Sequence, residues 1–334
     1  MSKISFVKGG KNKYIILSVI AVLLIAAILL TAIIVDRSKK GSTDNNDINV
    51  IEYSGKTYKL KSGVESFLIL GIDKSDENIE KDSYRNNQQA DFLMLVVFDH
   101  VNKTYSTVHI NRDTMAEVDK YGLTGKKTGT EKMQITLSHT YGDGGALSNR
   151  YTANSVSRLF MGVRVDNSVS FTLDSVGEMN GLVGGVTIEV LDDFTHLEGG
   201  ERLVKGDTVT LTDAEALLYV QHRKELDNNT NVNRMKRQSQ YIEALRIKLE
   251  ERIENDTDGV FLKDALEKMS DHMEVEDATT LQRVSEKMST YEFIEVDAID
   301  GESRLNEKTG RMEFLPDDDS LAKLTIKLFY TSEK

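Results

Sequence analysis

Three groups of charged and amide side chains in this sequence have the composition of a phosphate-binding site. Guanidinium groups match phosphate oxygens in a bidentate way, and carboxylates suit Mg²⁺ or Mn²⁺, which also bridge phosphate oxygens. The groups lie where regular elements are predicted to end, which is where open α/β sheets place their sites. Their members are Asp91 in "QQADFLML", Arg112 and Asp113 in "HINRDTM", and Arg223, Arg234, Arg237 and Gln238 in "YVQHRK" and "NRMKRQSQ". Together they suggest a pyrophosphate held by arginines and a metal ion.

One predicted helix carries polar side chains on the face that should be buried. At 100° per residue its apolar stripe is formed by Ile242, Leu245 and Leu249. Continued toward the N-terminus, the same stripe passes through Gln238 and Arg234, and Arg237 lies on its flank. The sequence therefore predicts that an acidic chain directs arginines toward its own interior.

Each of these features also has a structural interpretation that needs no ligand. Asp91 could simply begin a strand, and Arg112 with Asp113 could be a solvated pair in a turn. Arg234 and Arg237 could extend from a helix end to water or pair with surplus carboxylates. Because Arg234 lies on the predicted buried face, the last interpretation is weaker for that residue.

The distribution of charge argues against a general nucleic-acid surface. The chain has a net charge of −12, and residues 1–40 carry seven lysines and arginines against one aspartate, a charge of +6. The other residues therefore carry −18, because −12 − 6 = −18. An acidic surface repels a phosphate backbone, so we expect no nucleic-acid partner. A basic cluster beyond residue 40 is then a local feature built for one anionic group.

Residues 14–35 predict a membrane anchor. They read "YIILSVIAVLLIAAILLTAIIV", 22 residues without a charge, which as a helix spans roughly 33 Å, enough to cross a bilayer. A cleaved signal peptide would have a shorter apolar core and a small-residue cleavage site, and neither is evident. Four lysines precede the span and three basic residues follow it, which favours a cytoplasmic N-terminus. We expect a single-pass plasma-membrane protein with a cytoplasmic tail at residues 1–13 and its body outside.

The rest of the chain reads as a short extracellular linker with a small hairpin at residues 36–62 and one α/β domain at 63–334. Apolar runs predict strands, helical periodicity predicts helices, and Thr212 with Glu215 is placed for a capping box. Strands are expected around the hairpin 50–60, in 66–73, on both sides of a turn at 100–103, in 183–190 and in 290–299. Helices are expected near 131–141 and 151–162, from 212, and from about 231 to 253. The tail 254–334 is expected to hold a helix or two and to end in an amphipathic stretch at 319–330.

Six blocks in this order resemble proteins of the LytR-CpsA-Psr (LCP) family. They are "LILGID", "ADFLMLVVFD", "INRDT", "LVGGVTIEV", "LTDAEALLYVQHRK" and "NRMKRQSQYIEAL", and the similarity covers about residues 60–334. The resemblance implies an α/β/α sandwich with a central mixed sheet on a single N-terminal transmembrane helix. It also implies transfer of a glycopolymer, such as teichoic acid or capsular polysaccharide, from a polyprenyl-pyrophosphate carrier to peptidoglycan, with a phosphodiester as the product.

The resemblance also implies a role for each candidate residue. Asp91 and Asp113 would hold Mg²⁺ or Mn²⁺, and the apolar stripe would line a slot for the polyprenyl tail. The residues expected to grip the pyrophosphate are Arg112, Arg223, Arg234, Arg237 and Gln238. Among all of these, the ones expected to act in catalysis are Arg112, Asp113 and Arg234.

Four positions depart from the family pattern. Gln89 and Gln221 stand where arginines are usual, although Arg85 could substitute from a neighbouring loop. Asn231 stands where an aspartate is common, and Asn111 replaces the proline before Arg-Asp. These changes leave open a second hypothesis, a non-catalytic membrane-anchored module that binds or senses polyprenyl-linked glycan intermediates. A third, a membrane-tethered transcriptional attenuator, is disfavoured by the acidic body.

Overall fold

A computed structural model of the chain describes residues 49–73, 85–223, 226, 231–256, 260–275, 280, 283–284, 287–288 and 290–332. The predicted tail 1–13 and membrane helix 14–35 lie outside the described residues. Within the described part, no helix combines the length and the apolar character that crossing a bilayer requires.

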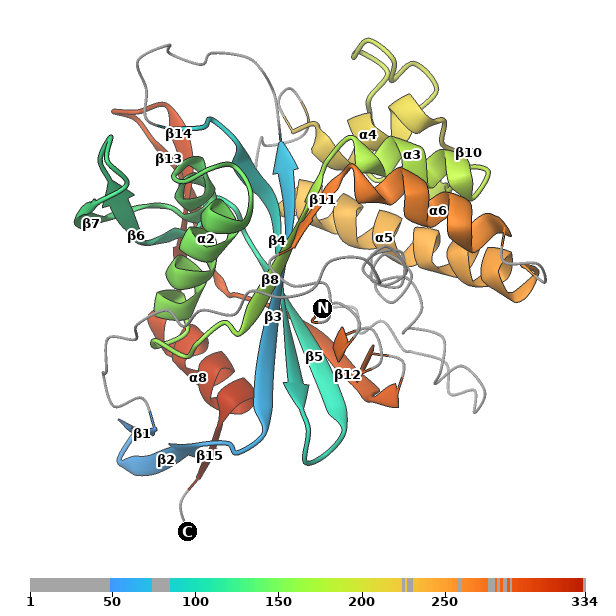
Figure 1. Ribbon diagram of the computed structural model, residues 1–334. Coiled ribbons are helices and arrows are strands. Elements are labelled where there is room, and N and C mark those ends of the chain that lie inside the picture. The colour runs from blue at the N-terminus through green and yellow to red at the C-terminus, as the bar shows by residue number, and fades with distance from the viewer. Residues whose placement is uncertain are drawn as a thin grey trace.

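A six-stranded mixed sheet forms the centre of the domain (Figure 1). Its strands, in spatial order, are β11 (Met273–Val275), β8 (Asn167–Thr172), β3 (Val64–Asp73), β4 (Gln89–Asp99), β5 (Thr104–Ile110) and β12 (Glu292–Ala298). β3 and β5 both pair antiparallel with β4, whereas β8 joins β3 and β12 joins β5 in parallel. The predicted central strand, the two strands joined by a turn and the strand near 290–299 are therefore confirmed.

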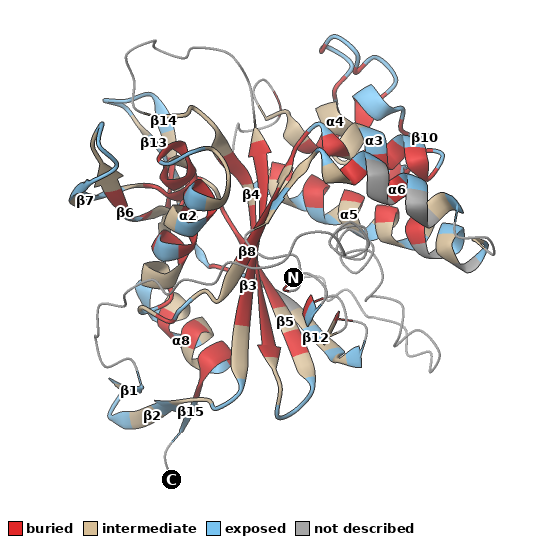
Figure 2. Ribbon diagram, viewed as in Figure 1, coloured by how far each residue is buried: buried red, intermediate tan, exposed pale blue. Residues whose placement is uncertain are grey.

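Both faces of this sheet are covered, which explains why β3 is apolar along its length. Leu68 and Leu70 belong to the core beneath α2 (Ala146–Leu159) and α8 (Asp318–Phe329). Phe67 and Ile69 alternate with them and belong to a second core on the opposite face. Figure 2 shows that burial is concentrated in these central strands and in the inward faces of the helices.

The second face is covered by four helices that lie together on the other side of the sheet (Figure 1). They are α3 (Ser175–Leu182), α4 (Asp213–Gln221), α5 (Asn231–Glu254) and α6 (Val260–Ser270). The three layers confirm the α/β class.

The predicted capping box of α4 is present, because Thr212 Oγ1 accepts from the backbone N–H of Glu215 while Glu215 Oε2 accepts from that of Thr212.

The small hairpin near the start of the domain is also confirmed. β1 (Val50–Tyr53) pairs antiparallel with β2 (Lys56–Leu60), and β15 (Tyr330–Ser332) adds to the other edge of β2. Ser54 and Gly55 both have positive φ, 50° and 73°, as a two-residue turn with the twist of the strands requires.

One expectation for the middle of the chain was partly wrong, and a second differed from the structure in its bounds. The predicted helix near 131–141 is instead strand β7 (Lys127–Gln134), paired with β6 (Met115–Tyr121) and followed by the 3₁₀ helix η3 (Ile135–Thr140). Residues 131–134, Glu-Lys-Met-Gln, are good helix formers, but pairing with β6 decides their conformation. The predicted helix at 151–162 exists but begins earlier and ends at Leu159.

Of two short strand pairings, one was partly predicted and one was missed. The expected strand in 183–190 shortens to β9 (Thr187–Glu189), which pairs with β10 (Thr208–Thr210). The hairpin of β13 (Gly301–Asn306) and β14 (Arg311–Pro316) was not predicted. The central strand β3 runs two residues past Gly71, where a Cβ atom would lie 2.9 Å from Phe92 Cβ, so only glycine fits.

His109 on β5 gives this packing a pH dependence. The ring is buried, 4.8 Å from that of Phe92, and burial lowers its pKa to about 3, with the charge of Arg234 acting in the same direction. The unfolded chain, with an ordinary histidine pKa near 6.5, binds more protons than the folded one between these values. His109 therefore makes the domain less stable as the pH falls from about 6.5 toward 3.

We predict that His109→Gln reduces the loss of unfolding free energy between pH 7 and pH 5, measured by urea denaturation. The wild type should lose up to about 1.4 kcal/mol more per pH unit below 6.5 than the variant does. His196→Gln at an exposed position is the control and should behave as wild type. Equal pH dependence in His109→Gln and wild type would contradict the prediction.

Candidate functional site

Four of the predicted site residues, Asp91, Arg112, Arg223 and Arg234, line a polar cavity of about 690 Å³. The cavity lies where β3 ends, where β4 begins, and where the C-terminal end of α4 meets the first turn of α5. Its lining residues are Asp73, Asn87, Gln89, Asp91, Arg112, Leu218, Gln221, His222, Arg223 and Arg234. The expectation that the polar groups gather at the ends of the strands is confirmed.

Asp91 is the centre of the charged network. One of its carboxylate oxygens pairs with Arg112, and the other lies 3.0 Å from Nη1 of Arg234. Both Asp91 and Arg234 are almost fully buried, at 5% and 2% exposed. A buried charge persists only where it is paired, so neither residue is a solvated end of an element. Asp91 is therefore part of a buried ion-pair network at the start of β4.

Asp113 lies on the other side of Arg112, whose Nε is 3.8 Å from Asp113 Oδ1. Arg223 Nη1 approaches Asp113 Oδ2 at 2.7 Å, and Gln134 Nε2 donates to Oδ1 at 2.9 Å. Gln134 is a site residue that sequence reasoning missed, because it lies at the end of the strand that was predicted as helix. Arg112 is thus held between two carboxylates.

Two departures from the family pattern contact each other. The side-chain N–H of Asn231 donates to Oδ1 of Asn111 at 2.8 Å, and the same oxygen accepts from the backbone N–H of Asp113 at 3.0 Å. The pair therefore links the first residue of α5 to the turn that carries Arg112 and Asp113. A single sequence could not reveal this, because 120 residues separate the two partners.

Gln89 changes the role of Arg112. Its side-chain Oε1 accepts from Nη2 of Arg112, while Nη1 of the same guanidinium pairs with Asp91. At this position an arginine would face Arg112 with like charge, whereas the amide gives it an acceptor. Gln221 also lines the cavity, and its backbone carbonyl accepts from Arg234 Nη1 at 3.4 Å.

Several donors in the cluster have no hydrogen-bond partner among the described residues. These buried nitrogens are Nε and Nη2 of Arg234 and Nε of Arg112. Burial lowers the pKa of Arg234 to about 10, with the charges of Arg112 and Arg223 acting in the same direction against Asp91 and Asp113. Buried donors in a folded protein are normally satisfied. Unsatisfied guanidinium nitrogens beside a cavity therefore fit an anionic ligand.

Three predicted phosphate ligands lie apart from this cavity wall. Arg85 stacks on the ring of Tyr141 at 4.5 Å and donates to its hydroxyl. Arg237 is buried and pairs with Asp192. Gln238 lines a different, apolar cavity and donates to the carbonyl of Val220 at 3.1 Å. Direct contact of these three side chains with phosphate stays a prediction.

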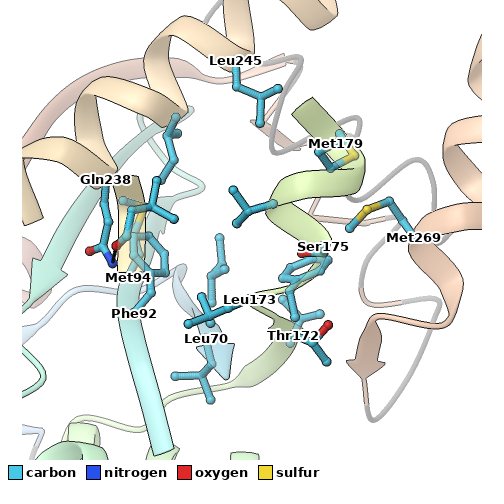
Figure 3. A pocket seen from close by; sticks show the side chains of 17 residues that line it. Leu70, Phe92, Met94, Thr172, Leu173, Ser175, Met179, Gln238, Leu245 and Met269 are labelled. Atoms are coloured by element: carbon cyan, nitrogen blue, oxygen red, sulfur yellow. Dashed lines mark hydrogen bonds between the residues drawn. The ribbon is translucent and has the colours of Figure 1, made fainter. Parts of the chain in front are cut away.

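The apolar cavity, about 140 Å³, lies between the central sheet and helices α3, α5 and α6. Figure 3 shows Gln238, Phe92 and Met94 at one side of it and Met179, Ser175 and Met269 at the other. Its walls also include Ile69, Val176, Ile242 and Leu245. The predicted stripe of α5 therefore faces a cavity over part of its length.

The apolar and polar cavities are lined by sequence neighbours on three elements. On α4, Val220 lines the apolar cavity and the next residue, Gln221, lines the polar one. On β4 the same division falls between Phe92 and Asp91. On α5 it falls within one turn, between Gln238 and Arg234. A ligand with a charged head and an apolar tail would match this arrangement.

The carboxylates fit a metal ion only together with a ligand. Asp91 and Asp113 already share one positive group, the guanidinium of Arg112, between them. Within the described residues, no cluster of three or more acidic, histidine or cysteine side chains forms a complete metal site. Mg²⁺ is commonly held by one or two carboxylates, with water and phosphate oxygens completing the shell. Asp91 and Asp113 could supply the carboxylate ligands of such a site, and a bound phosphate and water would supply the others.

Two curated proteins of known activity are similar to this chain. The polyisoprenyl-teichoic acid–peptidoglycan teichoic acid transferases TagU of Halalkalibacterium halodurans and TagV of Bacillus subtilis are each 26% identical to this chain. The matches cover 54% and 63% of this chain, and 51% and 48% of the relatives. The chain thus spans about half the length of these relatives.

A solved structure described as TagT bound to LI-WTA superposes with a TM-score of 0.57 at 20% identity, covering 80% of this chain and 90% of that one. At this identity the likeness shows the fold. The description of the LytR_cpsA_psr family matches residues 31–329, nearly the whole chain. The protein belongs to the LytR-CpsA-Psr family.

Proposed function

We propose that the protein transfers a glycopolymer from a polyprenyl-pyrophosphate carrier to peptidoglycan, forming a phosphodiester link. The observation that carries the proposal is that two cavities, one cationic and one apolar, are lined from the same three elements, β4, α4 and α5. A prenyl diphosphate has the same division between head and tail. The naming of two relatives as teichoic acid transferases supports the same reaction class.

In this proposal the diphosphate lies against Arg112, Arg223 and Arg234. Their guanidinium groups neutralise its charge and hold it in place, which is most of what phosphoryl transfer requires of a protein. The acceptor hydroxyl loses its proton and forms a bond to the phosphorus next to the sugar. The bond from that phosphorus to the bridging oxygen breaks, and polyprenyl phosphate leaves.

We propose further that Asp91 and Asp113 hold Mg²⁺, or Mn²⁺, when the diphosphate binds. Such an ion supplies neutralisation of charge on the phosphate oxygens. The aspartates also keep Arg112 between them, so the guanidinium is oriented before the substrate arrives. With residues 14–35 as a membrane anchor and the domain outside, carrier lipid and peptidoglycan would both be within reach.

The transfer reaction can be tested directly. We expect the full-length chain in detergent, with Mg²⁺, a polyprenyl-pyrophosphate-linked sugar and peptidoglycan, to release polyprenyl phosphate. Arg234→Lys keeps the charge but loses the planar guanidinium that binds phosphate in a bidentate way. The variant should therefore release polyprenyl phosphate about 100-fold more slowly, or slower still. Release by the wild type no faster than by this variant would exclude the activity.

The tail site can be tested separately through Ile242, which lines the apolar cavity from α5. Ile242→Trp should weaken binding of farnesyl diphosphate about tenfold, because the larger ring fills the cavity, and leave binding of inorganic pyrophosphate unchanged. Calorimetric titration measures both. Ile247→Trp, at an exposed position of the same helix, is the matched control and should bind both ligands normally. Equal effects of the two variants would contradict a prenyl site here.

The second hypothesis, a module that binds lipid-linked glycan without transferring it, draws support from Gln89. Arg112 Nη2 donates a hydrogen bond to the side-chain oxygen of Gln89, so this donor already has a partner within the protein. A binding module would retain tight polyprenyl-phosphate binding in Asp113→Ala and show no turnover in the wild type. Turnover in the wild type would exclude it.

A further inference from the structure

The last carbonyl groups of α4 accept hydrogen bonds from side chains of α5 rather than from the backbone that follows the helix. The last carbonyls of any α-helix lack partners within the helix. In α4, the carbonyl of Leu218 accepts from the backbone of His222, and the next four carbonyls in sequence all accept from α5 side chains. Tyr219 O accepts from Arg237 Nε at 2.8 Å, Val220 O from Gln238 Nε2 at 3.1 Å, Gln221 O from Arg234 Nη1 at 3.4 Å, and His222 O from Arg237 Nη2.

This capping gives the buried arginines a role besides ligand binding. A helix C-terminus carries partial negative charge, and cations near it are stabilised. Arg234 and Arg237 place two guanidinium groups there, on the buried face of α5. The polar first turns of α5 therefore supply cations and donors to the C-terminal carbonyl groups of α4.

The two arginines differ in what remains available to a ligand. Every nitrogen of Arg237 has a partner: Nε and Nη2 donate to the two carbonyls, and Nη1 pairs with Asp192. Its guanidinium also lies 5.2 Å from the ring centre of Phe194, and its exposed fraction is 1%. Arg234, in contrast, lines the polar cavity and keeps two nitrogens without a partner among the described residues.

We infer that Arg237 is a positioning residue, which holds Arg223 in the site without touching the substrate. Its Nη2 fixes the carbonyl of His222, the peptide group directly ahead of Arg223. Arg223 then reaches Asp113 at 2.7 Å. Asp192 orients the guanidinium that performs this task. The inference rests on the proposed function, in which Arg223 contacts the diphosphate.

The first test needs no substrate. In Arg237→Lys an ammonium keeps the charge but cannot donate to both carbonyls, so the last turn of α4 should open more often. We expect amide hydrogen exchange at residues 220–223 of the full-length protein to accelerate about tenfold, while amides of β3 exchange at the wild-type rate. Arg246→Lys, on the same helix and paired with Glu243, is the control. Unchanged exchange at 220–223, or equal acceleration in β3, would overturn the inference.

The second test separates positioning from direct contact. Affinity for farnesyl diphosphate is measured for wild type, Arg237→Lys, Arg223→Gln and the double variant. If Arg237 acts through Arg223, Arg237→Lys weakens binding about tenfold in the wild type but less than twofold once Arg223 is replaced. Equal losses in both backgrounds would make Arg237 a ligand and overturn the inference. Absence of binding by the wild type would refute the proposed function, while the exchange measurement still decides the role of Arg237.

Discussion

The pairing of Asp91 with two guanidinium groups is the constraint on which the site depends. Asp91 opens the charged end of β4, Arg112 follows β5, and Arg234 comes from the first turns of α5. None of these charges could be buried alone, because an unpaired ion in the interior costs several kcal/mol. The docking of α5 on the sheet and the formation of the polar cavity are therefore one event. Breaking the network at Asp91 would leave two buried cations facing each other.

The buried face of α5 contributes to the apolar core, to the polar cavity and to the capping of α4. Its middle turns close the apolar core through Leu245 and Leu249. Its first turns line the polar cavity through Arg234 and seal the end of α4 through Arg237. A helix that is apolar in one half and cationic in the other is consistent with a ligand of matching polarity. It is equally consistent with a neighbouring helix that ends there, and the structure shows that α4 does.

The elements that could be predicted from the sequence are set by residues a few positions apart. The elements that were missed are set by contacts with residues far away along the chain. The buried face of α5, the capping box at Thr212 and the central strands follow from periodicity and caps, which lie within a few residues. The strand β7 could not be predicted, because its partner β6 decides its conformation, and Gln134 was missed with it. Helical spacing placed Arg237 on the buried side correctly, but spacing does not say whether a side chain points to a cavity or to the next helix.

The charges of the cavity bear on how it could accept a diphosphate. Arg112, Arg223 and Arg234 contribute +3, and Asp91 and Asp113 contribute −2, which leaves +1 before Asp73 on the same wall is counted. Glutamines at positions 89 and 221, where the family usually has arginines, add no charge. A diphosphate diester carries two negative charges, more than this cavity can balance. The divalent cation that we propose would offset this shortfall, and the acidic side chains of the region are Asp73, Asp91 and Asp113.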